Sequence, residues 1–85
     1  MSEEFQVEYS PLCRSLEQNG KSVQVDIFKG DNGGWILEVV DEFNNSTVWD
    51  DEFDSDQAAL AEAQSTIKGE GIESLIGPES GSYNQ

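Results

Sequence analysis

Hydrophobic and polar residues alternate along the first part of this chain, in short runs that turn signals separate. The clearest run covers residues 22–28, where Val23, Val25 and Ile27 would share one face of a strand and Gln24 and Asp26 the other. Runs with strand character also cover residues 12–18, 35–42 and 47–53. Turn signals fall at 19–20, 31–34 and 44–46. Four short strands in succession predict an antiparallel meander.

The Asn19-Gly20 pair predicts the register of the first hairpin. Both residues of a two-residue hairpin loop must adopt positive φ, which Asn and Gly tolerate best. Such a loop places Leu16 opposite Val23 and Leu12 opposite Ile27. If the chain before Pro11 is also extended, the N-terminal residues lengthen this first strand.

The segment 35–42 is apolar on both faces, which is typical of a central strand. Trp35, Leu37 and Val39 alternate with Ile36 and Val40. We expect the Trp35 face to point toward the core, and a slip of one residue would exchange the two faces.

The period changes after residue 53. Asp54 or Ser55 can cap a helix, and strong helix formers continue to Lys68, so a helix is predicted over residues 55–68. The predicted fold is therefore α+β, a three- to four-stranded antiparallel meander with one C-terminal helix packed on one face. The predicted core is Val23, Val25, Ile27, Trp35, Leu37, Val39, Trp49, Phe53, Leu60, Ala63 and Ile67. Ile72, Leu75 and Ile76 can add a short apolar return after the helix.

The length of 85 residues suits one domain. We expect it to span residues 9–76, preceded by a flexible or edge-strand N-terminus (1–8) and followed by a disordered tail (77–85). No apolar run follows the acidic start of the chain, and no stretch is long enough to span a bilayer, which favours a cytoplasmic protein without membrane contact.

Charge restricts the possible partners. The chain has 18 Asp and Glu against 4 Lys and Arg, and its net charge is −14. Direct binding of nucleic acid rewards cationic proteins, so a basic protein surface is the expected partner. The chain has no His and one Cys, so we expect neither an enzyme nor a cofactor or a metal cluster. Cys13 falls on the non-core face of the first predicted strand and is expected to be an inert or mildly reactive thiol.

Five acidic residues gather just before and at the start of the predicted helix: Asp50, Asp51, Glu52, Asp54 and Asp56. A helix N-terminus favours Asp54 and Asp56, whereas alternation puts Asp50 and Glu52 on one strand face. The cluster is either a solvated charged surface or a binding surface for a basic protein. Alternatives are mimicry of DNA toward a DNA-binding protein, and weak binding of divalent cations. A calcium loop fits poorly, because Ser55 stands where that loop requires Gly.

Segments 33–40 and 54–63, with Trp49 between them, resemble the β-β-β-α core of HicB-type antitoxins. The resemblance covers residues 23–67. In that family the core binds a small basic ribonuclease and a separate segment binds DNA. The Pro-Asp-Leu-Pro-Gly-Cys segment of the family is replaced here by residues 41–45, and no DNA-binding segment follows. The chain also resembles small acidic bacterial proteins. If one helix covers one face of the sheet, the protein does not cover the other face itself. The protein is then either a monomer with that face exposed or a dimer formed through it.

Overall fold

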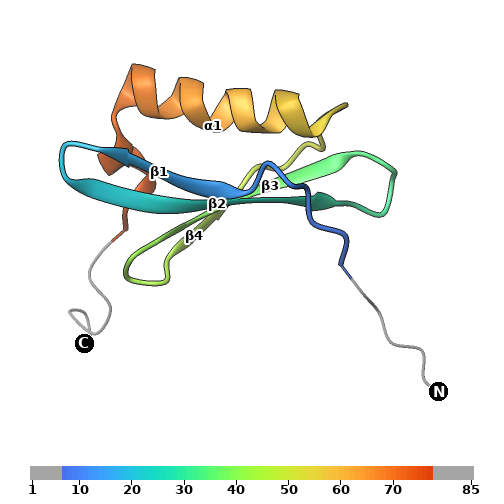
Figure 1. Ribbon diagram of the computed structural model, residues 1–85, viewed down its shortest axis with the longest axis horizontal. Coiled ribbons are helices and arrows are strands. Elements are labelled where there is room, and N and C mark those ends of the chain that lie inside the picture. The colour runs from blue at the N-terminus through green and yellow to red at the C-terminus, as the bar shows by residue number, and fades with distance from the viewer. Residues whose placement is uncertain (1–6, 78–85) are drawn as a thin grey trace.

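The computed structural model describes residues 7–77, which form an antiparallel sheet with one helix lying along one face (Figure 1). The elements are β1 (Arg14–Gln18), β2 (Lys21–Lys29), β3 (Trp35–Asp41), β4 (Ser46–Val48), the helix α1 (Asp56–Glu70) and the short 3-10 helix η1 (Ile72–Leu75). The strands lie side by side in chain order. The predicted α+β meander with a C-terminal helix is confirmed. The predicted flexible N-terminus and disordered tail fall largely on residues 1–6 and 78–85, outside the described residues.

The β1–β2 hairpin has the predicted two-residue loop. Asn19 and Gly20 both have positive φ, 56° and 80°, and Leu16 pairs with Val23 as predicted. Because residues that face each other across two strands share a face, the apolar side of β2 fixes the side of β1 that points toward α1.

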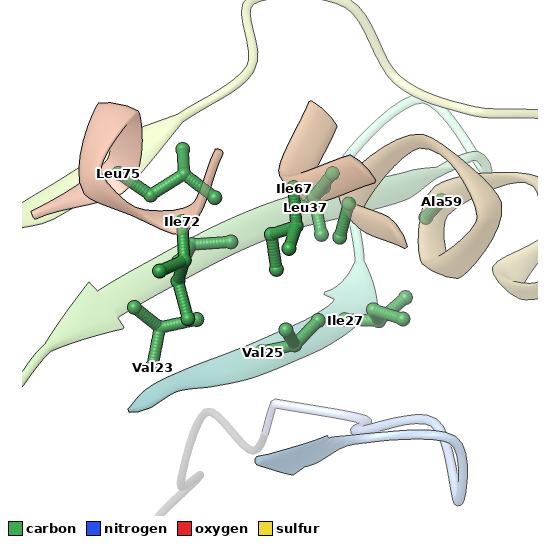
Figure 2. Close-up of a cluster of buried hydrophobic side chains, with 10 residues drawn as sticks. Val23, Val25, Ile27, Leu37, Ala59, Ile67, Ile72 and Leu75 are labelled. Carbon is green, nitrogen blue, oxygen red and sulfur yellow. The ribbon is translucent and has the colours of Figure 1, made fainter. Parts of the chain in front are cut away.

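The core lies between the sheet and α1 (Figure 2). Leu37 and Val39 are fully buried, so the predicted inward face of β3 is confirmed, and Trp35 packs partly buried at the end of the same face. The other buried apolar residues are Val23, Val25, Ile27, Ala59, Ala63, Ile67, Ile72 and Leu75. Ile72 and Leu75 come from η1 and complete a part of the core that the sequence prediction left out.

The helix begins and ends close to where the sequence predicts. The Ser55 side chain accepts a 3.0 Å hydrogen bond from the Ala58 N–H, which identifies Ser55 as the N-cap. At the other end Gly71, with φ 91°, donates its N–H to the Ile67 carbonyl. The small buried residues Ala59 and Ala63 allow the helix backbone to approach the sheet closely.

The first strand is shorter than predicted, because the chain bulges at residues 10–13. Arg14 pairs with Val25 in β2, and Tyr9 forms a bridge with Phe28. The four residues 10–13 therefore lie opposite only two residues of β2 (26 and 27). The prediction that Leu12 lies opposite Ile27 is therefore wrong. The N–H of Ile27 donates instead to the Sγ of Cys13 at 3.2 Å.

That contact also corrects the predicted place of Cys13. Its thiol donates to the Ile27 carbonyl at 3.5 Å, and the side chain packs against the core rather than on the open face. The sulfur therefore supplies the acceptor for the Ile27 N–H that a backbone carbonyl of a regular neighbouring strand would supply.

Candidate functional site

Asp50, Asp51 and Glu52 of the acidic cluster lie in a second bulge, not in the strand that the sequence predicts. β4 ends at Val48, which pairs with Glu38, whereas Phe53 bridges to Trp35. Four residues (49–52) therefore lie opposite only two residues of β3 (36 and 37). The predicted strand 47–53 is wrong beyond residue 48, and so is the prediction that Asp50 and Glu52 share a strand face. The N–H of Trp49 still donates to the Leu37 carbonyl at 3.1 Å, which fixes where the bulge begins.

Glu52 turns back toward the sheet and is half-buried. Its Oε1 accepts a 3.0 Å hydrogen bond from the N–H of Gly34, in the turn between β2 and β3. A Cβ at Gly34 would lie 2.8 Å from the Cβ of Glu52 and 3.0 Å from the Phe53 carbonyl oxygen. Glu52 therefore packs directly on the backbone of this turn, where only glycine fits, and its carboxylate has a structural partner.

Asp56 is also engaged. Its Oδ2 accepts a 2.8 Å hydrogen bond from the hydroxyl of Ser10, which is buried and also accepts from the Leu12 N–H at 2.9 Å. The backbone N–H of Ser10 donates to the Ile27 carbonyl at 2.8 Å. Ser10 thus joins the N-terminal segment, β2 and the start of α1, a role that the sequence analysis missed, because no local pattern indicates a contact between residues 46 positions apart.

The remaining three acids of the cluster, Asp50, Asp51 and Asp54, are exposed. Within residues 7–77 none of them forms a hydrogen bond or an ion pair through its side chain. The structure thus divides the five predicted site residues into two that hold the fold together and three that face solvent. No group of three or more acidic, Cys or His side chains in this part of the chain is arranged to hold a metal ion.

A sixth carboxylate, Asp41 at the end of β3, is buried and was not predicted as a site residue. Its Oδ1 accepts from the N–H groups of Phe43 and Asn45, at 2.9 and 2.8 Å. Its Oδ2 accepts from the Asn45 amide at 3.1 Å and from the Gly77 N–H at 2.7 Å. Burial alone would raise the pKa of Asp41, but these four hydrogen bonds outweigh it and hold the pKa below its ordinary value.

A signal for Asp41 was present in the sequence, because it continues the inward-facing series of Leu37 and Val39. Its carboxylate ties the β3–β4 turn to Gly77, a residue that the sequence analysis assigned to the tail. The hydrogen bonds of Asp41 are all internal, so we interpret it as a structural residue.

The face of the sheet that α1 does not cover is the third candidate. We call it the outer face and define it by the alternate residues of the strands that point away from α1. Its apolar members are Tyr9, Phe28, Ile36, Val40 and Val48. Tyr9 and Val48 are 59% and 51% exposed, and the Tyr9 and Phe28 rings contact each other with centroids 5.8 Å apart. Figure 1 shows α1 on the opposite side of the sheet from this face.

A shallow hollow of about 160 Å³ lies at one end of the outer face. Ser15, Gln24 and Val40, which pair in a row across three strands, form much of its lining, together with Ser22 and Glu42. The lining of the hollow contains no nucleophile paired with a base and no cation, so we regard it as a surface depression rather than an active site.

The chain matches no protein-family model, no curated protein and no solved structure in our comparisons. The resemblance to HicB-type antitoxins therefore stays a prediction from the sequence. Within residues 7–77 no helix is both long enough and apolar enough to cross a membrane.

Proposed function

We propose that this chain is a non-catalytic, acidic protein-interaction module whose partner is a basic protein. The observation that carries the proposal is the exposed position of Asp50 and Asp51 in the bulge and of Asp54 just after it, where no cation of the described residues pairs with them. Free carboxylates on a chain of net charge −14 attract cationic surfaces and accelerate encounter with them. In the HicB-type antitoxins that the sequence resembles, the corresponding core binds a basic ribonuclease, which is a partner of this class.

The positions of the cations support the proposal. Arg14 donates through Nε to the Leu12 carbonyl, and the Lys29 Nζ lies 4.7 Å from the centre of the Trp35 ring. Lys68 lies in the last turn of α1, where it complements the negative end of the helix dipole. Arg14, Lys29 and Lys68 thus serve local structure, and none of them pairs with the exposed carboxylates of Asp50, Asp51 and Asp54.

Affinity purification of the full chain from its native cell at low ionic strength tests the proposal. We expect to recover a cationic protein whose retention falls as salt rises, because exposed charge pairs are screened. The variant Asp50→Asn/Asp51→Asn should retain less of it than the matched variant Glu70→Gln/Glu73→Gln, which removes the same number of exposed charges at the other end of α1. Recovery of no cationic protein at low salt would refute the proposal, and equal losses in the two variants would show that net charge alone is responsible.

A further inference from the structure

The outer face is negative as well as apolar. Residues that pair across strands share a face, so Arg14 lies on the side of Val25, toward α1, and Lys21 and Lys29 belong to the same alternate series of β2. Lys68 lies on α1 itself. All four Lys and Arg of the chain therefore lie on the helix side of the sheet, and the charged residues that the described strands place on the outer face are all acidic.

Two of these carboxylates oppose each other at the centre of the outer face. Asp26 of β2 pairs directly with Glu38 of β3, and both side chains are half-buried. Like charges directly opposite each other on a sheet are destabilising. The Gln24 amide donates to Asp26 Oδ1 at 3.2 Å, but Glu38 has no side-chain partner among the described residues. The two central strands thus hold a repulsive pair in a place that a cation from outside can reach.

An apolar row flanks this pair on one side, and a row of one polar and one apolar residue flanks it on the other. Phe28 pairs with Ile36 on one side and Gln24 pairs with Val40 on the other, while Val48 lies beside Glu38 on β4. Alternate residues of a strand lie about 6.6 Å apart, so along β3 an apolar, an acidic and an apolar contact follow one another at that spacing. Residues i and i+4 of a helix lie about 6 Å apart along its axis, so side chains at this interval match the spacing of the contacts along β3.

We infer that the outer face is the docking surface for a basic amphipathic helix of the partner, with a Lys or Arg between Asp26 and Glu38 and apolar residues against Ile36 and Val40. The inference rests on the proposed function and deepens it, because it names the surface that anchors the partner. Charge complementarity selects this occupant. A second copy of the chain would bring Asp26 and Glu38 against the acidic pair of its neighbour, with no cation on either face to compensate.

Two surfaces of the molecule then have different roles in binding. The exposed carboxylates of Asp50, Asp51 and Asp54, in and just after the bulge at 49–52, attract a cationic partner, whereas the outer face combines charge with apolar area and holds it. Anchoring contacts of interfaces are central, apolar or aromatic and desolvated, and rim charges chiefly change the rate of encounter.

Titration of the full chain with designed peptides, followed by amide NMR, tests the inference. The probe is a 15-residue amphipathic helix of Leu and Arg, and the controls carry Glu in place of each Arg or Gln in place of each Leu. We expect shifts centred on Asp26, Phe28, Ile36 and Glu38 with the Leu-Arg probe and none with either control. The protein variants are Asp26→Asn/Glu38→Gln and, with the same change in net charge, Asp50→Asn/Asp51→Asn.

The Asp26→Asn/Glu38→Gln variant should bind the probe roughly tenfold more weakly than the parent, and the Asp50→Asn/Asp51→Asn variant should bind it with little change in the dissociation rate. A larger loss for Asp50→Asn/Asp51→Asn would overturn the inference and leave the proposed function standing. Equal losses of affinity in the two variants would show that only the net charge of the protein determines binding. That result would contradict both the inference and the proposed function. Sedimentation as a dimer through the outer face, or nuclear Overhauser contacts from residues 1–6 or 78–85 to that face, would identify another occupant and overturn the inference.

Discussion

The hydroxyl of Ser10 donates a hydrogen bond to the carboxylate of Asp56 at 2.8 Å, and this contact joins the chain before β1 to the first turn of α1. Ser10 is the first residue of the bulge at 10–13, and Asp56 comes shortly after the bulge at 49–52. The bond therefore fixes two irregular segments against each other at the same end of the sheet.

Ser10→Ala should lower the free energy of unfolding by about 1–2 kcal/mol, because it removes a buried donor and leaves the Leu12 N–H without its acceptor. Urea unfolding of Ser10→Ala, Asp56→Ala and the double variant should give a coupling energy of at least ~0.5 kcal/mol. Ser65→Ala, on the exposed side of α1, is the control and should change stability by less than ~0.5 kcal/mol. Additive effects of the two substitutions would contradict a direct bond.

Asp41→Asn should destabilise the protein by about 2 kcal/mol or more at neutral pH, because the new amide brings a donor to a site that already contains four donors. The folded pKa of Asp41 is below its unfolded value, so its contribution is complete above the unfolded value, about 3.9, and is lost as pH falls through the folded pKa. The stability difference between parent and Asp41→Asn, measured by urea unfolding, should thus be largest above about pH 5 and shrink below about pH 4.

Glu42→Gln is the control for that experiment, since Glu42 is exposed and adjacent. Many carboxylates titrate in the same range, and comparison with this control isolates the part that belongs to Asp41. A difference for Asp41→Asn that stays constant from pH 7 to pH 3 would contradict the hydrogen-bonded carboxylate.

Two glycine substitutions should have opposite effects. Gly34→Ala should destabilise the fold by roughly 1–3 kcal/mol, because its Cβ would collide with Glu52 and the Phe53 carbonyl. Gly69→Ala should stabilise it by about 0.5–1 kcal/mol, since Gly69 lies within α1 and its Cβ would meet nothing within 4 Å. Thermal unfolding of both variants measures the effects, and a stabilising Gly34→Ala would contradict the close packing of Glu52.

Glu38→Gln should raise the free energy of unfolding by about 0.2–1 kcal/mol, because it removes one of two like charges that face each other across β2 and β3. The gain should shrink as salt is added. Glu17→Gln is the matched control, since Glu17 lies opposite Ser22 rather than another acid, and it should change stability less. A destabilising Glu38→Gln would show that the pair does not repel.

The sequence predicts the regular part of this fold well, because local patterns determine it. The Asn19-Gly20 loop sets the register of the first hairpin, and the alternation of Val23, Val25 and Ile27 identifies the inward face. Ser55, one of the two predicted caps, is the N-cap of α1, and the helix continues only two residues beyond the predicted end at Lys68.

The two bulges could not be predicted, because distant contacts stabilise them. Glu52 accepts a hydrogen bond from Gly34, and Ser10 donates one to Asp56. Neither contact corresponds to a periodic pattern of hydrophobic and polar residues in the sequence. The candidate site changed for the same reason, since alternation in a straight strand would have kept Glu52 beside Asp50. By contrast, Asp26 was already predicted to point away from the core, and the opposition to Glu38 required only the register of β2 and β3.

The two bulges have a consequence for how the protein behaves at high concentration. Open sheet edges are templates onto which further strands can add, and this is a common route to aggregation. Here β4 is three residues long, and regular pairing on the opposite edge is interrupted at 10–13, so within residues 7–77 neither edge offers a long, flat row of free backbone groups. Filament growth by edge-to-edge pairing should therefore be suppressed even when the net charge is neutralised at low pH.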